Sequence, residues 1–129
     1  MNPEQDSPKL AEIHWEGDSR EVLAGFPEEA RGSLGFALYE LQLGRRPALG
    51  RRRMESIGVG VYELKDGDEK TWYRVVYLSK VGNVIYVLHC FEKQSRKTAR
   101  RDLEIATARL SRVQQGIQEQ RKHAKRSGE

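Results

Sequence analysis

The 129-residue chain has one cysteine, three histidines and no long apolar run. Because Cys90 has no second cysteine to pair with, an internal disulfide is excluded. His14, His89 and His123 are too widely spaced to form a recognisable zinc motif with Cys90, so the sequence predicts neither a metal site nor a cofactor. The N-terminal residues have neither the basic start nor the apolar stretch of a signal peptide, and no segment approaches the about 18 apolar residues of a membrane span. We therefore expect a cytoplasmic protein that makes no membrane contact.

Length and composition fit one folded domain with polar ends. Hydrophobic residues make up 37% of the chain and charged residues 33%. Two tryptophans, five tyrosines and three phenylalanines provide material for a core, which argues against a disordered chain. The expected organisation is a flexible N-terminus over residues 1–9, a domain over residues 10–113, and a helix end with a basic polar tail over residues 114–129.

Charge is divided unevenly along the chain. Residues 1–44 carry three basic and nine acidic side chains, whereas residues 45–129 carry twenty and ten. The loop GRRPALGRRR, residues 44–53, contains five arginines and no acid. A basic region of this kind is typical of a protein with a polyanionic partner such as nucleic acid. A solvated basic face without a partner is the alternative.

Local patterns predict an α+β fold. Residues 10–15 resemble a short strand, and a helix begins at Asp18, with Glu21 placed to complete a capping box. A second helix runs from Pro27 to Gly44. Three strands, at residues 54–65, 71–79 and 83–91, are separated by turn signals at residues 66–67 and 82–83, which indicates an antiparallel meander. Thr98 is placed to cap a final helix.

Alternation along the strands suggests which side chains share a face. We expect the two N-terminal helices to cover the face that holds Tyr62 and Tyr73, leaving Glu63, Lys65 and Arg74 on an open face, where Glu63 and Arg74 are candidate cross-strand partners. Periodicity does not orient the last strand. The final helix has a narrow apolar seam that packs either on the edge of its own sheet or against a partner helix: Leu103, Ala106, Leu110, Val113 and Ile117.

Two arginines lie at the start of this final helix, where positive charge opposes the helix dipole. Arg100 and Arg101 are therefore unfavourable at this helix start, and a bound phosphate would offset their positive charge. Side chains that simply point into water are the alternative.

Four segments carry a resemblance to a known family: GVYEL (60–64), YRVVY (73–77), IYVLHCFEKQSRKT (85–98) and RRDLEIA (100–106). In this order of elements they resemble the phage-derived Gp49-like, HigB-type toxins of the RelE and ParE superfamily. The resemblance implies a RelE-like fold, with an N-terminal strand and two helices packed on the meander and a helix at the C-terminus. It also implies a type II toxin that cleaves mRNA in the ribosomal A site without a metal, partnered by the ribosome and a small helix-turn-helix, HigA-like antitoxin.

Fold alone does not settle the target of such a toxin. The ParE branch of the superfamily poisons DNA gyrase with the same fold, so a noncatalytic gyrase inhibitor is one alternative. A degenerate toxin, or a structural phage-related protein that only binds nucleic acid, is another.

The resemblance assigns catalytic roles to Arg74 and Lys93, and strand alternation adds Glu63, near which the best-known RelE toxins have a basic residue. Arg74 matches the arginine of the YR motif and would bind the scissile phosphate, a task suited to a planar cation. Lys93 matches the basic position after the last strand and would stabilise charge or protonate the leaving group. Glu63 is a candidate base, or an ion-pair partner that orients Arg74.

Further residues are candidates for acid–base chemistry, for base stacking or for contact with the RNA backbone. His89 is a candidate acid–base group or a satisfied core histidine. Tyr86 stacks on a base or fills the core, and Trp72 is a stacking platform or part of the sheet packing. The basic side chains that we expect to hold the RNA backbone are Arg51, Arg52, Arg53, Lys65, Arg96, Lys97, Arg100 and Arg101.

Overall fold

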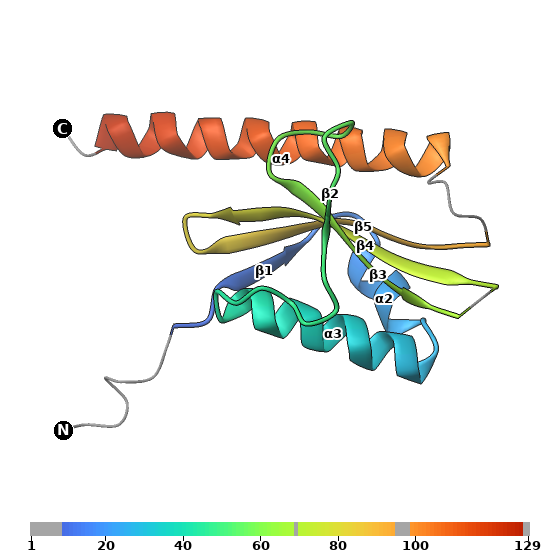
Figure 1. Ribbon diagram of the computed structural model, residues 1–129. Coiled ribbons are helices and arrows are strands. Elements are labelled where there is room, and N and C mark those ends of the chain that lie inside the picture. The colour runs from blue at the N-terminus through green and yellow to red at the C-terminus, as the bar shows by residue number, and fades with distance from the viewer. Residues whose placement is uncertain (1–8, 69, 95–98, 128–129) are drawn as a thin grey trace, which may run out of the picture.

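The computed structural model describes residues 9–68, 70–94 and 99–127. Within these residues one five-stranded sheet lies between helices on both faces (Figure 1). The strand order across the sheet is β1-β5-β4-β3-β2. In chain order the elements are β1 (Glu12–Trp15), α2 (Ser19–Ala24), α3 (Glu28–Gln42), β2 (Arg52–Arg53), β3 (Val61–Gly67), β4 (Trp72–Val81), β5 (Val84–Lys93) and α4 (Arg100–Ser127).

The predicted α+β class is confirmed. Strands β3, β4 and β5 form the antiparallel meander, and β1 pairs with β5 in parallel. The predicted strand over residues 54–65 is wrong in its first half. Its chain turns at Met54, whose carbonyl accepts hydrogen bonds from the amides of Ile57 and Gly58, and β3 begins only at Val61. The arginines before this turn form β2, which pairs with β3 at one edge of the sheet.

Helices α2 and α3 cover the expected face of the sheet. Tyr62 and Tyr73 pack against a buried cluster that includes Leu34, Leu64 and Tyr77. The apolar stripe of α3 supplies one side of this core, and every member is buried: Ala30, Leu34, Ala37, Leu38 and Leu41.

The other face is covered by α4, so the expectation of an open face is wrong. The α4 residues Ala106, Leu110 and Val113 are buried in a second cluster with residues of β3, β4 and β5. The alternative in which this helix packs on its own sheet is therefore correct, although the contact is with a face rather than an edge. Helix α4 continues to Ser127, and none of the described helices is long and apolar enough to cross a membrane.

A β-bulge explains why periodicity could not orient β5. Val76 pairs with His89, but the next residue of β4, Tyr77, pairs with Val87, which leaves Leu88 as an extra residue. Leu88 belongs to the cluster beneath α4, and His89 contacts α4 as well. Two consecutive side chains therefore lie toward the same helix, which no alternating pattern predicts.

Candidate functional site

A buried ion pair lies on the face of the sheet on which α4 packs. Nη1 of Arg74 lies 3.2 Å from Oε2 and 3.4 Å from Oε1 of Glu63. The two side chains are only 1% and 2% exposed. Glu63 pairs with Val76, and Arg74 pairs with Lys65 two positions along the ladder, so the contact is diagonal across β3 and β4. Of the two roles predicted for Glu63, this geometry fits the ion-pair partner of Arg74.

Two exposed cations and one half-buried cation lie on the same face as the ion pair. Arg52, on β2, lies 3.7 Å from Glu63 and is 62% exposed. Together with Lys65 it lines a shallow hollow of about 130 Å³ beside Glu63. The Lys65 ammonium lies 4.7 Å from the centre of the Trp72 ring, and Trp72 pairs with Lys93 across β4 and β5. We call Arg52, Lys65 and Lys93 the cationic rim.

The loop arginines do not form one patch. While Arg52 reaches the Glu63 carboxylate, Arg51 lies 4.1 Å over the ring of Tyr62, on the face that α3 covers. Arg53 is exposed and pairs through its backbone with Tyr62. The three arginines that sequence reasoning placed together are thus distributed over both sides of the sheet edge.

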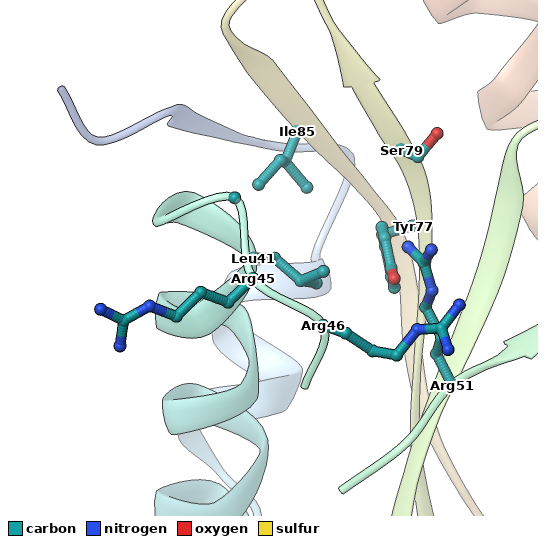
Figure 2. Close-up of a pocket in the computed structure, with 8 residues that line it drawn as sticks. Leu41, Arg45, Arg46, Arg51, Tyr77, Ser79 and Ile85 are labelled. Atoms are coloured by element: carbon teal, nitrogen blue, oxygen red, sulfur yellow. The ribbon is translucent and has the colours of Figure 1, made fainter. Parts of the chain in front are cut away.

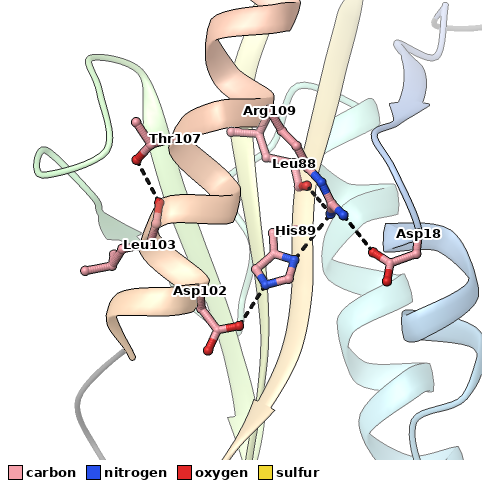
Figure 3. Close-up of polar contacts among 7 residues, drawn as sticks. All are labelled: Asp18, Leu88, His89, Asp102, Leu103, Thr107 and Arg109. Carbon is pink, nitrogen blue, oxygen red and sulfur yellow. Dashed lines mark hydrogen bonds and ion pairs between the residues drawn. The ribbon is translucent and has the colours of Figure 1, made fainter.

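His89 is part of a polar network between the sheet and two helices (Figure 3). Its Nε2 lies 2.8 Å from the carboxylate of Asp102, and its Nδ1 lies 3.3 Å from Nη1 of Arg109. Because a guanidinium only donates hydrogen bonds, Nδ1 accepts and Nε2 carries the proton that Asp102 accepts. His89 is 6% exposed, so the satisfied-core alternative describes its position.

The sequence matches the family described as Phage derived protein Gp49-like (DUF891) over residues 21–111. The chain belongs to this family. The matched segment runs from α2 into α4 and includes Glu63, Arg74, His89 and Arg109. No curated protein matches the chain.

In this Gp49-like protein Arg109 is the functional candidate that sequence reasoning missed. It donates hydrogen bonds to the Leu88 carbonyl at 3.0 Å and to Asp18 at 3.0 Å. The capping role predicted for Asp18 is wrong, since its side chain makes no cap hydrogen bond and its carboxylate binds Arg109 instead. Gly17 has a φ of +56°, and a Cβ there would lie 2.4 Å from the Arg109 guanidinium. Gly17 followed directly by Asp18 is the one local feature of the sequence that indicates the close approach of a charged side chain from another segment.

The remaining predicted residues of the Gp49-like chain are dispersed. Tyr86 packs half-buried on the α4 side, with its ring edge-on to His14 at 5.3 Å. Arg100 is 93% exposed and pairs with Glu104 at 3.1 Å, and Arg101 is exposed. Thr98 and two of the predicted RNA contacts lie outside the described residues: Arg96 and Lys97.

A metal site is not seen among the described residues, where no three histidine, cysteine or carboxylate side chains come together. The single thiol is also unsuited to ligation. Burial, and secondarily the negative charge of Asp18, raise the pKa of Cys90 to about 12. A thiol with this pKa stays protonated near neutral pH, whereas metal binding and nucleophilic attack need the thiolate.

Proposed function

We propose that this Gp49-like protein is the toxin of a type II toxin–antitoxin module and cleaves messenger RNA on the ribosome. The observation that carries the proposal is the cationic rim beside a half-exposed indole. Arg52, Lys65 and Lys93 provide positive charge for the RNA backbone, and Trp72 provides a surface on which a base can stack. The family supports the proposal, because phage-derived Gp49-like proteins resemble HigB-type toxins.

In cleavage by the 2′-hydroxyl, that oxygen gives up its proton to water and forms a bond to phosphorus. The bond between phosphorus and the 5′-oxygen breaks, and the departing oxygen takes up a proton. Charge on the phosphate must be stabilised in the transition state. Lys93, at the end of β5, is assigned either to stabilising this charge or to protonating the departing oxygen. Arg74 is assigned to the phosphate, but at 1% exposure it reaches a phosphate only after exchanging Glu63 for it. Glu63 is therefore assigned to positioning Arg74.

A small helix-turn-helix antitoxin completes the proposed module. It would be encoded beside the toxin and would restrain it until the antitoxin is degraded. Coexpression with the neighbouring open reading frame should relieve growth arrest and should yield a stable complex on gel filtration.

The proposal is tested by ribosome binding and single-turnover message cleavage. Neutralising Lys65 and Lys93 together to Gln should lower the salt slope of RNA binding by roughly 1.4, because each single-strand phosphate contact contributes about 0.7. Lys93→Gln alone should slow cleavage more than it weakens binding. Lys122→Gln is the matched control, since Lys122 is an exposed cation near the C-terminal end of α4. Chelators should leave cleavage unchanged.

Three outcomes would contradict the proposal. A salt slope that the single variant Lys122→Gln lowers by half as much as the Lys65 and Lys93 double variant does would reduce the rim to general surface charge. Altered plasmid supercoiling with intact messages would identify a ParE-like gyrase inhibitor. Binding of RNA without cleavage or growth arrest would identify a degenerate or structural nucleic-acid-binding protein.

A further inference from the structure

A second basic pocket lies on the opposite side of the sheet from the Glu63–Arg74 pair. It is a cavity of about 300 Å³ between the C-terminal end of α3 and strands β4 and β5. Leu41 and Ile85 provide an apolar wall, and Arg46, Arg51 and Tyr77 also line it (Figure 2). Leu41, Ile85 and Tyr77 belong to the core beneath α3, so α4 and the cationic rim are not part of this pocket.

A buried hydroxyl group without a partner points into this pocket. The Tyr77 side chain is 1% exposed, and its oxygen makes no hydrogen bond within the described part of the chain. The Arg51 guanidinium lies beside this oxygen and lowers the pKa of Tyr77 through hydrogen bonding and its positive charge, although the contact falls outside strict hydrogen-bond geometry. Burial raises the pKa of Tyr77 more than this positive neighbour lowers it, so the phenol keeps its proton and has a hydrogen to donate. A buried donor left unpaired costs stability, which a ligand that accepts from it would recover.

Two guanidinium groups stand beside this hydroxyl without a counter-charge. Arg51 is held over the Tyr62 ring, which stacks on Tyr77 with ring centres 5.8 Å apart. Arg46 extends toward Tyr77 from the loop after α3, whereas its neighbour Arg45 extends away (Figure 2). Within the described residues neither Arg46 nor Arg51 forms an ion pair, and no carboxylate lines the pocket. The pocket therefore presents donors and positive charge with nothing in the described chain to accept them.

We propose that this pocket binds a phosphate group, with Arg46, Arg51 and the Tyr77 hydroxyl as its donors. Two planar guanidinium groups match the charge and the several acceptor oxygens of a phosphate, for which arginine is well suited. A carboxylate has only two oxygens and one charge, so it would leave part of this donor set unused. The phosphate belongs either to the backbone of an RNA strand or to a free nucleotide. The pocket does not depend on the proposed cleavage reaction, because it shares neither Lys93 nor Trp72 with that site.

Arg46 and Arg45 offer a matched pair of variants. Both are exposed cations on the same loop and both line the pocket, but only Arg46 extends toward Tyr77 (Figure 2). Arg51 is less decisive, because it also borders the hollow beside Glu63. The measurement is calorimetric titration of the full chain with inorganic phosphate. Arg46→Gln should weaken binding about tenfold, which corresponds to one charged hydrogen bond, while Arg45→Gln should change it less than about twofold.

Tyr77→Phe removes only the hydroxyl and should weaken phosphate binding by roughly fivefold or more. Ultraviolet difference spectra give a second readout, since bound phosphate should delay formation of the Tyr77 phenolate to higher pH. Two uridine hexanucleotides, with and without a 5′-phosphate, separate the sources of the group. Equal binding of both favours backbone phosphates, and a requirement for the 5′-phosphate favours a nucleotide or a strand end.

The proposal is overturned if Arg45→Gln and Arg46→Gln weaken phosphate binding equally, because the effect would then be general charge. It is also overturned if Tyr77→Phe binds phosphate as well as the parent protein does and melts at the same temperature. Tighter binding of a glutamate-rich peptide than of either oligonucleotide would assign the pocket to an acidic protein partner instead. Loss of cleavage in Lys93→Gln with unchanged phosphate binding would support a phosphate pocket that is separate from the cleavage site.

Discussion

Arg109 of α4 donates a hydrogen bond to the carboxylate of Asp18, a residue that lies 91 positions earlier in the chain. The same guanidinium binds the Leu88 carbonyl, which lies just beyond the last residue of β5 that pairs with β1. It also donates to His89. One side chain thus joins the start of α2, the bulge in β5 and α4.

Removing this side chain should destabilise the protein strongly. In Arg109→Ala the Leu88 carbonyl and His89 lose a donor in a largely buried site, so we expect unfolding to become easier by about 2–3 kcal/mol. Arg112→Ala, one helical turn further on at an exposed position, should change stability by less than about 0.5 kcal/mol. Urea unfolding followed by circular dichroism measures both. Equal effects would show that the network contributes nothing beyond helix propensity.

The Glu63–Arg74 pair should show the asymmetry of buried charges. Arg74→Met leaves a buried carboxylate whose one remaining ion pair within the described residues is with the exposed Arg52, and we expect a loss of about 3–5 kcal/mol. The double variant Arg74→Met with Glu63→Leu should lose clearly less. Thermal or urea unfolding of the three proteins gives the comparison. A double variant as unstable as the single one would mean that packing, not charge, dominates. Any activity test on Arg74 needs this stability control.

Alkaline pH should weaken the fold through Cys90. Burial raises the pKa of its thiol to about 12, whereas an unfolded cysteine has a pKa of about 8.5. Above pH 8.5 the unfolded chain binds fewer protons than the folded one, so stability falls as pH rises toward 12. Between pH 8 and pH 10 the thiol should account for about 2 kcal/mol of that fall, which Cys90→Ala should remove. Tyr77 has a raised pKa as well, so the parent and variant curves must be compared at each pH. Parallel curves would contradict the assignment.

Acid should loosen the turn between β3 and β4. The carboxylate of Asp68 accepts hydrogen bonds of 2.8 Å from the backbone amides of Thr71 and Lys70, and these bonds lower the pKa of Asp68 below its ordinary value of 3.8. The bonds therefore persist above that value and are lost as pH falls through the lowered pKa of the folded state. The amide resonances of Lys70 and Thr71 should shift together in this acidic range. Asp68→Asn, which has no carboxyl group to titrate, should abolish the shared shift.

Local signals predicted the elements of this fold well. The turn signal at 82–83 lies between β4 and β5, whereas the signal at 66–67 falls on the last two residues of β3, just before the turn. The spacing of apolar residues predicted the buried stripe of α3 correctly. The face covered by α2 and α3 was also predicted. These features depend on residues that are close in sequence, so a short window of sequence contains them.

The candidate site was less predictable because its contacts are distant in sequence. Alternation placed Glu63 and Arg74 on one face but could not show that α4 buries that face. The bulge at Leu88 breaks the period on which such reasoning rests. Arg109 looked like one more exposed cation on a basic helix, and only its approach to Gly17 and Asp18 reveals its role.

The parallel pairing of β1 with β5 also sets an order of events during synthesis. β1 leaves the ribosome first, yet its hydrogen-bonding partner β5 is the last strand in the chain. Residues 12–15 therefore cannot pair until residues 84–87 have been synthesised. The β3–β4–β5 meander needs only short-range closures and can form earlier. Until β1 docks, the outer edge of β5 is an unpaired template for other chains. The first strand made is therefore the last to be placed, and nascent chains are most exposed to aggregation in that interval.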